Sequence, residues 1–442
     1  MKIPYLVAAA LCLGATSATA QMEQTHGAGS EQHVVSADER RVALDAIAAK
    51  LPENYVFPEK TAAIVAKFTQ LRQTGRYDVA DPRLLADRVT EDLRAASGDR
   101  HLYLLYDPEH YAAAKKDEAG TAEGDSDFEQ RAALHDHHGL TELRILPGNI
   151  RYLKLTEFQW VPDVTGTVYD DAMRFLKDGD ALIIDIRGNG GGSHGAVRYL
   201  VSHFMEGDIL ELTFLARGKP PEQSRTLEHV PAGRMKGKPL YVLIDGGVGS
   251  AAEAFAYDVE QFKLGELIGA KTAGAANNNA FTPIAPGFML SVPFGRPEHA
   301  VNHANWEGVG IPPTIETPPG QALDVAQSVA LDRLEKIAGI TPAQRVEYAW
   351  AKVSVEARLH PAGAKSLRLS SFVGRYGPNE VKLIDGALWL SRNHGAARQL
   401  IAMTADGLFA VDGIDVMRVH FDGKVMETTW MGEPDARVFP RN

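Results

Sequence analysis

Cysteine is almost absent from this chain: its 442 residues contain one, Cys12. Cys12 lies within residues 1–20, where Lys2 precedes a short apolar run and an Ala-x-Ala sequence ends at Ala20. This pattern is typical of a secretory signal peptide that is cleaved near Ala20. The cleaved protein would contain no thiol, which excludes disulfides, thiolate metal sites and a cysteine nucleophile.

Long apolar runs and clusters of basic residues are also lacking. No stretch after the signal is apolar for long enough to span a bilayer, so we expect no transmembrane segment. Asp and Glu number 57 against 46 Lys and Arg, which gives a net charge of −11. An acidic chain without a basic patch is a poor candidate for binding nucleic acid or anionic membranes. Because of the signal peptide, we expect an exported protein, periplasmic or secreted after cleavage near Ala20.

Patterns along the remaining sequence divide it into segments. Ser36 can cap a first helix, and prolines at positions 58 and 82 suit the first turns of two more. From about residue 140 continuously apolar strands alternate with helices, as in a buried α/β sheet. Short strands separated by Gly- or Asp-containing turns then predict an antiparallel module. The predicted order is a signal peptide (1–20), a flexible leader (21–36), a helical domain (37–114), a linker (115–139), an α/β core (140–340) and a C-terminal β module (345–442).

A serine stands where a buried strand turns into a helix. Residues 239–245 form an apolar strand that ends in two glycines, and an amphipathic helix begins at Ala251. The hydroxyl of Ser250 is therefore expected at the end of the strand, beside the free N–H groups of the helix N-terminus. That geometry suits a nucleophile, with the Ala251 N–H stabilising negative charge. The alternative is that Ser250 merely caps the helix.

A second informative run, DALIIDIRGNGGGSHG (180–195), ends a buried strand in a glycine-rich turn. Its glycines satisfy G-x-G-x-x-G, so a dinucleotide site must be considered. The Asp185-x-Arg187 pair before the glycines is foreign to that fingerprint, and we expect the two side chains to pair and hold the turn. The alternative is that the N–H of Gly190 or Gly191 forms half of an oxyanion hole, with Ala251 supplying the other half.

Four motifs occur in order: DALIIDIRGNGGG (180–192), SAAE (250–253), GAKTAG (269–274) and WEGVGIPP (306–313). Together they resemble the tail-specific and C-terminal-processing serine peptidase superfamily, which includes the tricorn core protease and interphotoreceptor retinoid-binding protein. ENYVFPEK, GRYD and SGDRHLYL in the helical domain resemble the retinoid-binding branch. The resemblance implies an α/β fold with a crotonase-like ββα spiral core, and attack on peptide bonds.

The resemblance also bears on the general base. Processing peptidases of this superfamily carry a lysine directly after T-x-G, but here Ala275 occupies that position. The tricorn-like branch instead uses an earlier histidine and a glutamate in E-G-V-G, which correspond to His101 and Glu307. By themselves, His101 is more often an ordinary surface or core residue and Glu307 an ordinary loop carboxylate. Arg100 stands where a tricorn-type site carries a serine, which is a departure from the pattern.

The sequence thus predicts an exported serine peptidase that acts on peptide or protein substrates and requires no cofactor or metal. Ser250 would be the nucleophile, His101 the base and Glu307 its orienting carboxylate. Ala251 with Gly190 or Gly191 would form the oxyanion hole. The alternative function is a non-catalytic binding protein for apolar ligands or peptides on the same scaffold. A homo-oligomer is compatible with either function.

Overall fold

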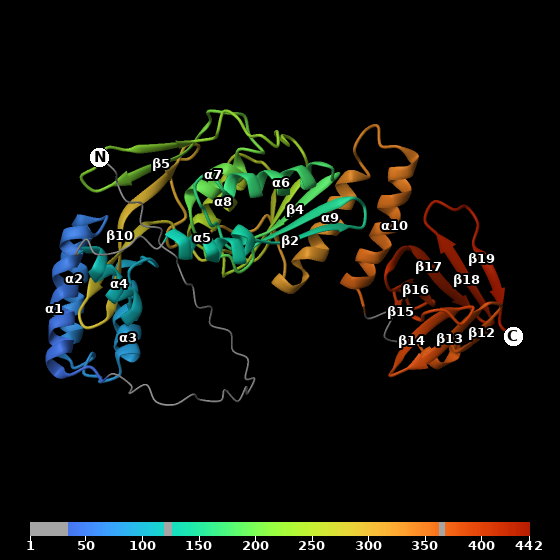
Figure 1. The fold of residues 1–442 in the computed structure, drawn as a ribbon, viewed down its shortest axis with the longest axis horizontal. Coiled ribbons are helices and arrows are strands. Elements are labelled where there is room, and N and C mark those ends of the chain that lie inside the picture. Colours follow the sequence, from blue (N-terminus) through green and yellow to red (C-terminus); the bar gives the residue numbers. More distant parts are fainter. Residues whose placement is uncertain (1–33, 119–125, 362–366) are drawn as a thin grey trace.

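The computed structural model describes residues 34–118, 126–361 and 367–442. The predicted signal peptide, and the predicted leader up to residue 33, lie outside the described residues. Three parts follow one another along the longest axis: a helical part, an α/β part and a C-terminal sheet (Figure 1). Among the described residues, no helix is both long enough and apolar enough to cross a bilayer.

The helical part contains α1 (Ala37–Asn54), α2 (Pro58–Gln73) and α3 (Pro82–Ser97). Ser36 caps α1, and Glu39 completes the capping box, so both side chains satisfy backbone N–H groups that the helix leaves free. Proline occupies the first turn of α2 and of α3, as the sequence predicted. The apolar faces of these helices pack on residues of neighbouring strands, including Leu104 and Leu290.

The predicted linker 115–139 contains regular structure. The segment holds the end of α4 (Pro108–Glu118), α5 (Ser126–His135) and a 3₁₀ turn (His137–Gly139). Their sequences are rich in Ala, Lys, Glu and Gln, which favour helices without any apolar periodicity. A prediction based on periodicity therefore fails here. The outer boundaries of the predicted domains remain predictions.

The α/β part is built on a six-stranded sheet. Its order is β11 (Ile315–Glu316), β8 (Glu266–Gly269), β7 (Leu240–Ile244), β4 (Ala181–Asp185), β3 (Ile150–Leu155) and β2 (Leu140–Leu146). All neighbouring pairs are parallel except β2 with β3. The α/β class is therefore confirmed. β4 and β7 lie at the centre and are buried throughout.

Helices cover both faces of this sheet. One face packs against α6 (Thr165–Lys177), α7 (His194–Val201) and α8 (Ser250–Gln261), and the other against α9 (Ala322–Leu334) and α10 (Pro342–Leu359). Successive residues of β4 divide between the two cores: Leu182 and Ile184 belong to the first and Ile183 to the second. This two-sided burial explains why the strands read as continuously apolar.

A second sheet joins the helical part to the core. Its strands are β1 (Tyr103–Tyr106), β10 (Phe288–His299), β5 (Leu210–Ala216) and β6 (Glu222–Arg225), with β9 (Asn278–Ile284) also paired to β10. The first half of β10 pairs with β1 and β9, and the second half with β5. One strand therefore belongs to both parts (Figure 1).

The predicted start of the C-terminal β module, residue 345, is wrong, because residues 345–359 lie in α10. Thr341 caps α10 and forms a capping box with Gln344, and Pro342 takes the first position. These are strong signals for a helix start. These signals lie directly before residue 345, and the prediction of the β module did not use them.

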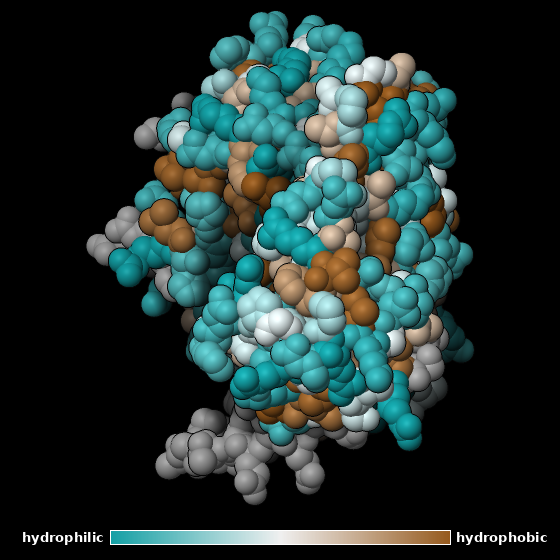
Figure 2. All heavy atoms as spheres, turned by 90° about the vertical axis from the view of Figure 1, so that its right-hand side faces the viewer, coloured by the Kyte–Doolittle hydropathy of each residue, from teal (hydrophilic) through white to brown (hydrophobic). Residues whose placement is uncertain are grey.

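The C-terminal sheet is antiparallel, as predicted, and its eight strands pair in chain order. They are β12 (Gly374–Tyr376), β13 (Asn379–Ile384), β14 (Ala387–Arg392), β15 (Arg398–Ala402), β16 (Leu408–Val411), β17 (Ile414–Asp422), β18 (Val425–Trp430) and β19 (Arg437–Pro440). A bridge between Tyr376 and Arg441 joins the first strand to the end of the last. The sheet thus closes into an up-and-down barrel around its own apolar core. Seen from this end, the surface carries separate apolar patches divided by hydrophilic residues (Figure 2).

Candidate active site

Ser250 lies at the first position of α8, directly after the turn that follows β7. Its φ of +51° is in the left-handed region, which costs a non-glycine residue of the order of 1 kcal/mol or more. The Ser250 N–H donates to the carbonyl of Ala275 over 3.1 Å, which fixes this backbone. Among the described residues, the Ser250 hydroxyl has no hydrogen-bond partner. It is therefore not the cap of its helix.

Glu253, one turn into α8, was not singled out from the sequence. Its carboxylate is fully buried and accepts hydrogen bonds from the Thr272 hydroxyl (2.5 Å) and from the N–H groups of Gly274 (2.6 Å) and Ala275 (2.7 Å). A longer bond of 3.2 Å comes from the Ser250 N–H. Burial raises the pKa of Glu253, and these donors oppose the shift. Glu253 thus ties the serine turn to the segment that follows β8.

The glycine-rich turn packs directly against the serine. A Cβ added to Gly191 would lie 2.7 Å from the Ser250 Cβ and 3.0 Å from the Ala251 nitrogen. With φ at +122°, Gly191 also has a backbone that side chains disfavour. No residue other than glycine fits this position without moving Ser250.

Some of the backbone N–H groups around Ser250 already donate a hydrogen bond, and others, among the described residues, have no acceptor. Gly191 N–H donates to the Asn189 side chain over 2.9 Å. The N–H groups of Gly190 and Ala251 have no acceptor within the described part of the chain. Asn189 is fully buried, and its side-chain amide also donates to Leu155. Of the two alternatives for the first half of an oxyanion hole, Gly190 therefore has the free donor.

Asp185 and Arg187 pair at the base of this turn, as predicted. Arg187 Nε donates to the Asp185 carboxylate over 2.9 Å and its Nη2 over 2.5 Å. Lys154 adds a 3.2 Å contact from β3. The pKa of Asp185 is lowered overall because its bond to Arg187 and the charge of Lys154 outweigh the opposing effect of burial. These three residues stabilise the glycine-rich turn from below and have a structural role.

His101 lies in a turn two residues before β1. It is 5% exposed, and its Nδ1 is buried without a hydrogen-bond partner. Burial, with a smaller contribution from Arg94, lowers the pKa of His101 to about 4. The ring is therefore neutral at pH 7. Within the described residues no hydrogen bond joins this ring to Ser250.

Glu307 lies in the loop after β10 and is bound by three backbone N–H groups. They belong to Ala276 (2.6 Å), Asn277 (2.9 Å) and Arg100 (3.2 Å). Burial and the nearby Asp99 raise the pKa of Glu307 to about 7. Glu307 thus connects the loop that carries His101 to the segment that follows the Thr272-Ala273-Gly274 turn.

Asp99 lies beside His101 and Glu307 and was not predicted as a site residue. It is 2% exposed and accepts hydrogen bonds from the His101 N–H (2.9 Å), the Asn277 side chain (2.8 Å) and the Tyr55 hydroxyl (3.2 Å). One ring nitrogen of His101 and one oxygen of each carboxylate, Asp99 and Glu307, lie within 4.8 Å of one another. The signal in the sequence was G-D-x-H, in which an aspartate precedes the histidine by two residues.

A single short segment connects this acidic group to the serine. The carbonyl of Ala275 accepts the Ser250 N–H and also the indole N–H of Trp306, the latter over 3.2 Å. The next two residues along the chain donate to Glu307. Ser250 and Glu307 are therefore held by adjacent residues of the same segment, although 57 positions separate them in sequence.

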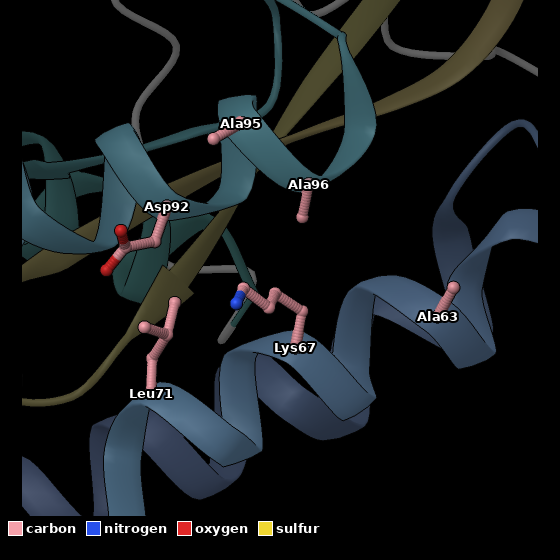
Figure 3. Close-up of a pocket in the computed structure, with 6 residues that line it drawn as sticks. All are labelled: Ala63, Lys67, Leu71, Asp92, Ala95 and Ala96. Carbon is pink, nitrogen blue, oxygen red and sulfur yellow. The ribbon is translucent and has the colours of Figure 1, made fainter. Parts of the chain in front are cut away.

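Two other features of the described residues bring polar groups together or form a groove. In one of them, the buried Glu211 of β5 accepts a 2.8 Å hydrogen bond from Ser224, which also contacts His194 Nε2. Asp258 of α8, whose charge acts on Glu211, contacts His299 over 3.2 Å. A groove of about 290 Å³ lies between α2 and α3, lined by Ala63, Lys67, Leu71, Asp92, Ala95 and Ala96 (Figure 3). Neither feature includes Ser250 or His101.

Comparison with known proteins identifies the class. The model of peptidase family S41 matches residues 149–317, and the model described as the N-terminal domain of peptidase S41 in eukaryotic IRBP matches residues 37–134. The two models describe the core and the N-terminal domain of one peptidase family, and together they cover more than half of the chain. The chain belongs to peptidase family S41, as the motifs predicted.

Individual relatives are distant. The chain is 25% identical over 179 residues to the carboxy-terminal processing protease CtpB of Bacillus subtilis (strain 168). The aligned segment covers 40% of this chain and 35% of that protein. The chain thus matches about a third of the length of that curated relative. A solved structure of a putative peptidase from Parabacteroides merdae is 20% identical, with a TM-score of 0.47, and the match covers 69% of this chain and 99% of that one. A lipoprotein from Streptococcus agalactiae is 16% identical with a TM-score of 0.43, covering 70% and 99%.

Proposed function

We propose that this chain is an active serine peptidase that hydrolyses peptide bonds through Ser250. The observation that carries the proposal is the placement of Ser250. Its backbone is held in a strained conformation at the start of a buried helix, its hydroxyl is free, and Gly191 packs against it. Strain of this kind persists where the surrounding structure determines it, as it often does at catalytic residues.

In the proposed reaction His101 is the general base. Its low pKa supports this role because only a neutral ring can accept the Ser250 proton. The serine oxygen then attacks the substrate carbonyl carbon, and the imidazolium returns its proton to the leaving amine. Water hydrolyses the resulting acyl-enzyme by the same route. Glu307, when ionised, stabilises the imidazolium.

Negative charge on the substrate oxygen is stabilised by backbone donors in this proposal. The Ala251 N–H is available at the N-terminus of α8, and the Gly190 N–H is available across the turn. Both are fixed before substrate arrives, so they need no reorganisation when the charge develops. Gly191 contributes its small size and not an oxyanion donor, because its N–H already donates to the Asn189 side chain.

The proposed pathway requires His101 to approach Ser250 when substrate binds. The two residues come from different parts of the chain, and catalytic hydrogen bonds often form only in the substrate complex. The absence of such a bond among the described residues is also what favours the second candidate, a binding protein for peptides or apolar ligands.

Cleavage of a mixed peptide library, followed by mass spectrometry, separates the two candidates. The chain is compared with Ser250→Ala, His101→Ala and the control His110→Ala, which changes an exposed histidine paired with Asp107. If the proposal is right, wild type and His110→Ala cleave peptides, whereas Ser250→Ala and His101→Ala do not. Binding of peptides by wild type without cleavage, and without covalent labelling of Ser250 by a fluorophosphonate, would instead establish the binding protein.

We also propose that the protein is exported, with peptides or proteins outside the cytoplasm as its substrates. The support is the signal-like sequence that ends at Ala20. N-terminal sequencing of protein expressed with residues 1–20 intact tests this proposal. A mature chain that begins at Gln21 in the exported fraction is expected, and retention of Met1 would contradict it.

A further inference from the structure

The group formed by Asp99, His101 and Glu307 has a geometry that goes beyond the catalytic roles proposed for two of its members. It places one imidazole and two carboxylates so that one donor atom of each lies within 4.8 Å of the others. Nitrogen and carboxylate oxygen are the donors that Zn²⁺ takes in sites with three protein ligands and one open position. The donor set therefore fits a transition-metal ion better than Mg²⁺ or Ca²⁺, which prefer oxygen alone.

The His101 ring is an independent observation. It is 5% exposed, and its Nδ1 has no hydrogen-bond partner. A buried polar atom without a partner is costly unless something else satisfies it. One nitrogen of this ring belongs to the group of donor atoms, so the ring is directed toward the carboxylates.

The charges point the same way. Within the described residues, neither Asp99 nor Glu307 forms an ion pair with a lysine or arginine. Two largely buried carboxylates beside a neutral ring leave local negative charge that a cation would neutralise. The backbone and side-chain donors that bind both carboxylates orient them, as outer-shell hydrogen bonds orient metal ligands.

We propose that Asp99, His101 and Glu307 bind Zn²⁺ and that the bound ion switches the peptidase off. A neutral imidazole has one nitrogen lone pair. When Zn²⁺ occupies it, none is left to accept the Ser250 proton. The switch-off rests on the function proposed above, whereas binding of the ion does not.

Binding is measured by calorimetric titration of ZnCl₂ into the full chain, with MgCl₂ as the comparison ion. The Ser250→Ala variant keeps the ligands and removes turnover, so binding is read without any activity. We expect one equivalent of Zn²⁺ in wild type and in Ser250→Ala, and no heat with Mg²⁺. His101→Ala, Asp99→Asn and Glu307→Gln should each weaken binding by about tenfold or more.

The chain supplies a matched control in the double variant His135→Ala/His137→Ala, since both residues are exposed and lie outside the group. This variant should bind as wild type does. Thermal unfolding shows which ligand variants are folded, and a rise in the wild-type melting temperature with Zn²⁺ but not with Mg²⁺ gives a reading independent of the variants. Zinc binding that is lost in the control but kept in folded His101→Ala and Glu307→Gln would overturn the site, as would no binding by wild type.

Inhibition is tested separately with a peptide that wild type cleaves. We expect Zn²⁺ to stop cleavage at the concentration that fills the calorimetric site, and EDTA to restore it. Undiminished cleavage at saturating Zn²⁺ would overturn the switch. If wild type cleaves no peptide at all, the proposed function fails while the calorimetric result still decides the metal site.

Discussion

At the residue scale, the contact between Gly191 and Ser250 is the most sensitive point of the site. We expect Gly191→Ala to lower kcat/KM by about a hundredfold, because the new Cβ must displace the nucleophile from its position. Gly188→Ala is the control. Gly188 also has a positive φ, +72°, but its Cβ would meet no atom within 4 Å. An equal loss of activity in both variants would show that backbone strain, and not displacement of Ser250, is the cause.

Glu307 should determine how activity depends on pH. With a pKa raised to about 7, it is largely protonated in mildly acidic solution and can stabilise the imidazolium only after it ionises. We therefore expect kcat/KM to rise with pH through about 7. Glu307→Gln should be slower and lack this rise. A wild-type profile that is flat between pH 6 and 8 would remove Glu307 from the proposed role.

Local sequence was enough to select Ser250, and the family resemblance selected His101 and Glu307, but neither assigned a role to Asp99. The strand, the glycines and the helix around Ser250 are local features, so periodicity and turn chemistry predict them. The contacts of Asp99 with Tyr55 and Asn277 join residues that are 44 and 178 positions apart. No local pattern encodes contacts at such separations. The occupied N–H of Gly191 was missed because it depends on the rotamer of Asn189.

At the scale of elements, α8 depends on the buried carboxylate of Glu253. Glu253→Gln replaces an acceptor oxygen with an amide donor that would face other donors. We expect a loss of about 3 kcal/mol in the free energy of unfolding, and a lower kcat as the serine turn loosens. Glu260→Gln, on the same helix, should change stability by about 0.5 kcal/mol or less. Chemical denaturation of the two variants makes the comparison, and similar losses would contradict it.

The start of α10 offers a smaller test. Thr341→Ala removes the cap that the Gln344 N–H uses and should cost about 1 kcal/mol, whereas Thr341→Ser keeps a hydroxyl and should be nearly neutral. Equal midpoints in urea for the alanine and serine variants would contradict this role for Thr341.

The same helix shows why strand spacing and turn composition alone did not place every element. T-P-A-Q was in the sequence, and a search for capping boxes would have found the start of α10. Closure of the barrel is different. It depends on a bridge between Tyr376 and Arg441, 65 positions apart, which no turn or periodicity specifies.

At the scale of the whole molecule, stability should depend on a buried acidic pair. Burial and the neighbouring Asp258 raise the pKa of Glu211 to about 8. The folded state therefore keeps a proton that the unfolded chain releases near its ordinary pKa. Stability attributable to this group is greatest below about pH 4.5 and falls as the pH rises through about 8.

Urea unfolding of wild type and Glu211→Gln between pH 5 and 9 tests this prediction. The variant cannot ionise, so its stability should decline less over that interval. Parallel curves for the two proteins would show that Glu211 is not the titrating group.

β10 runs as one strand from the helical part into the α/β part. His101 precedes β1, which pairs with the first half of β10, while the second half pairs with β5. The ladder between β9 and β10 is interrupted between Pro293 and Gly295. In the proposed mechanism, a rotation that carries His101 toward Ser250 would bend this strand, and the interrupted ladder marks the point where bending breaks the fewest paired hydrogen bonds. The movement that completes the proposed site would then pass through a single strand, at a point outside the chemistry itself.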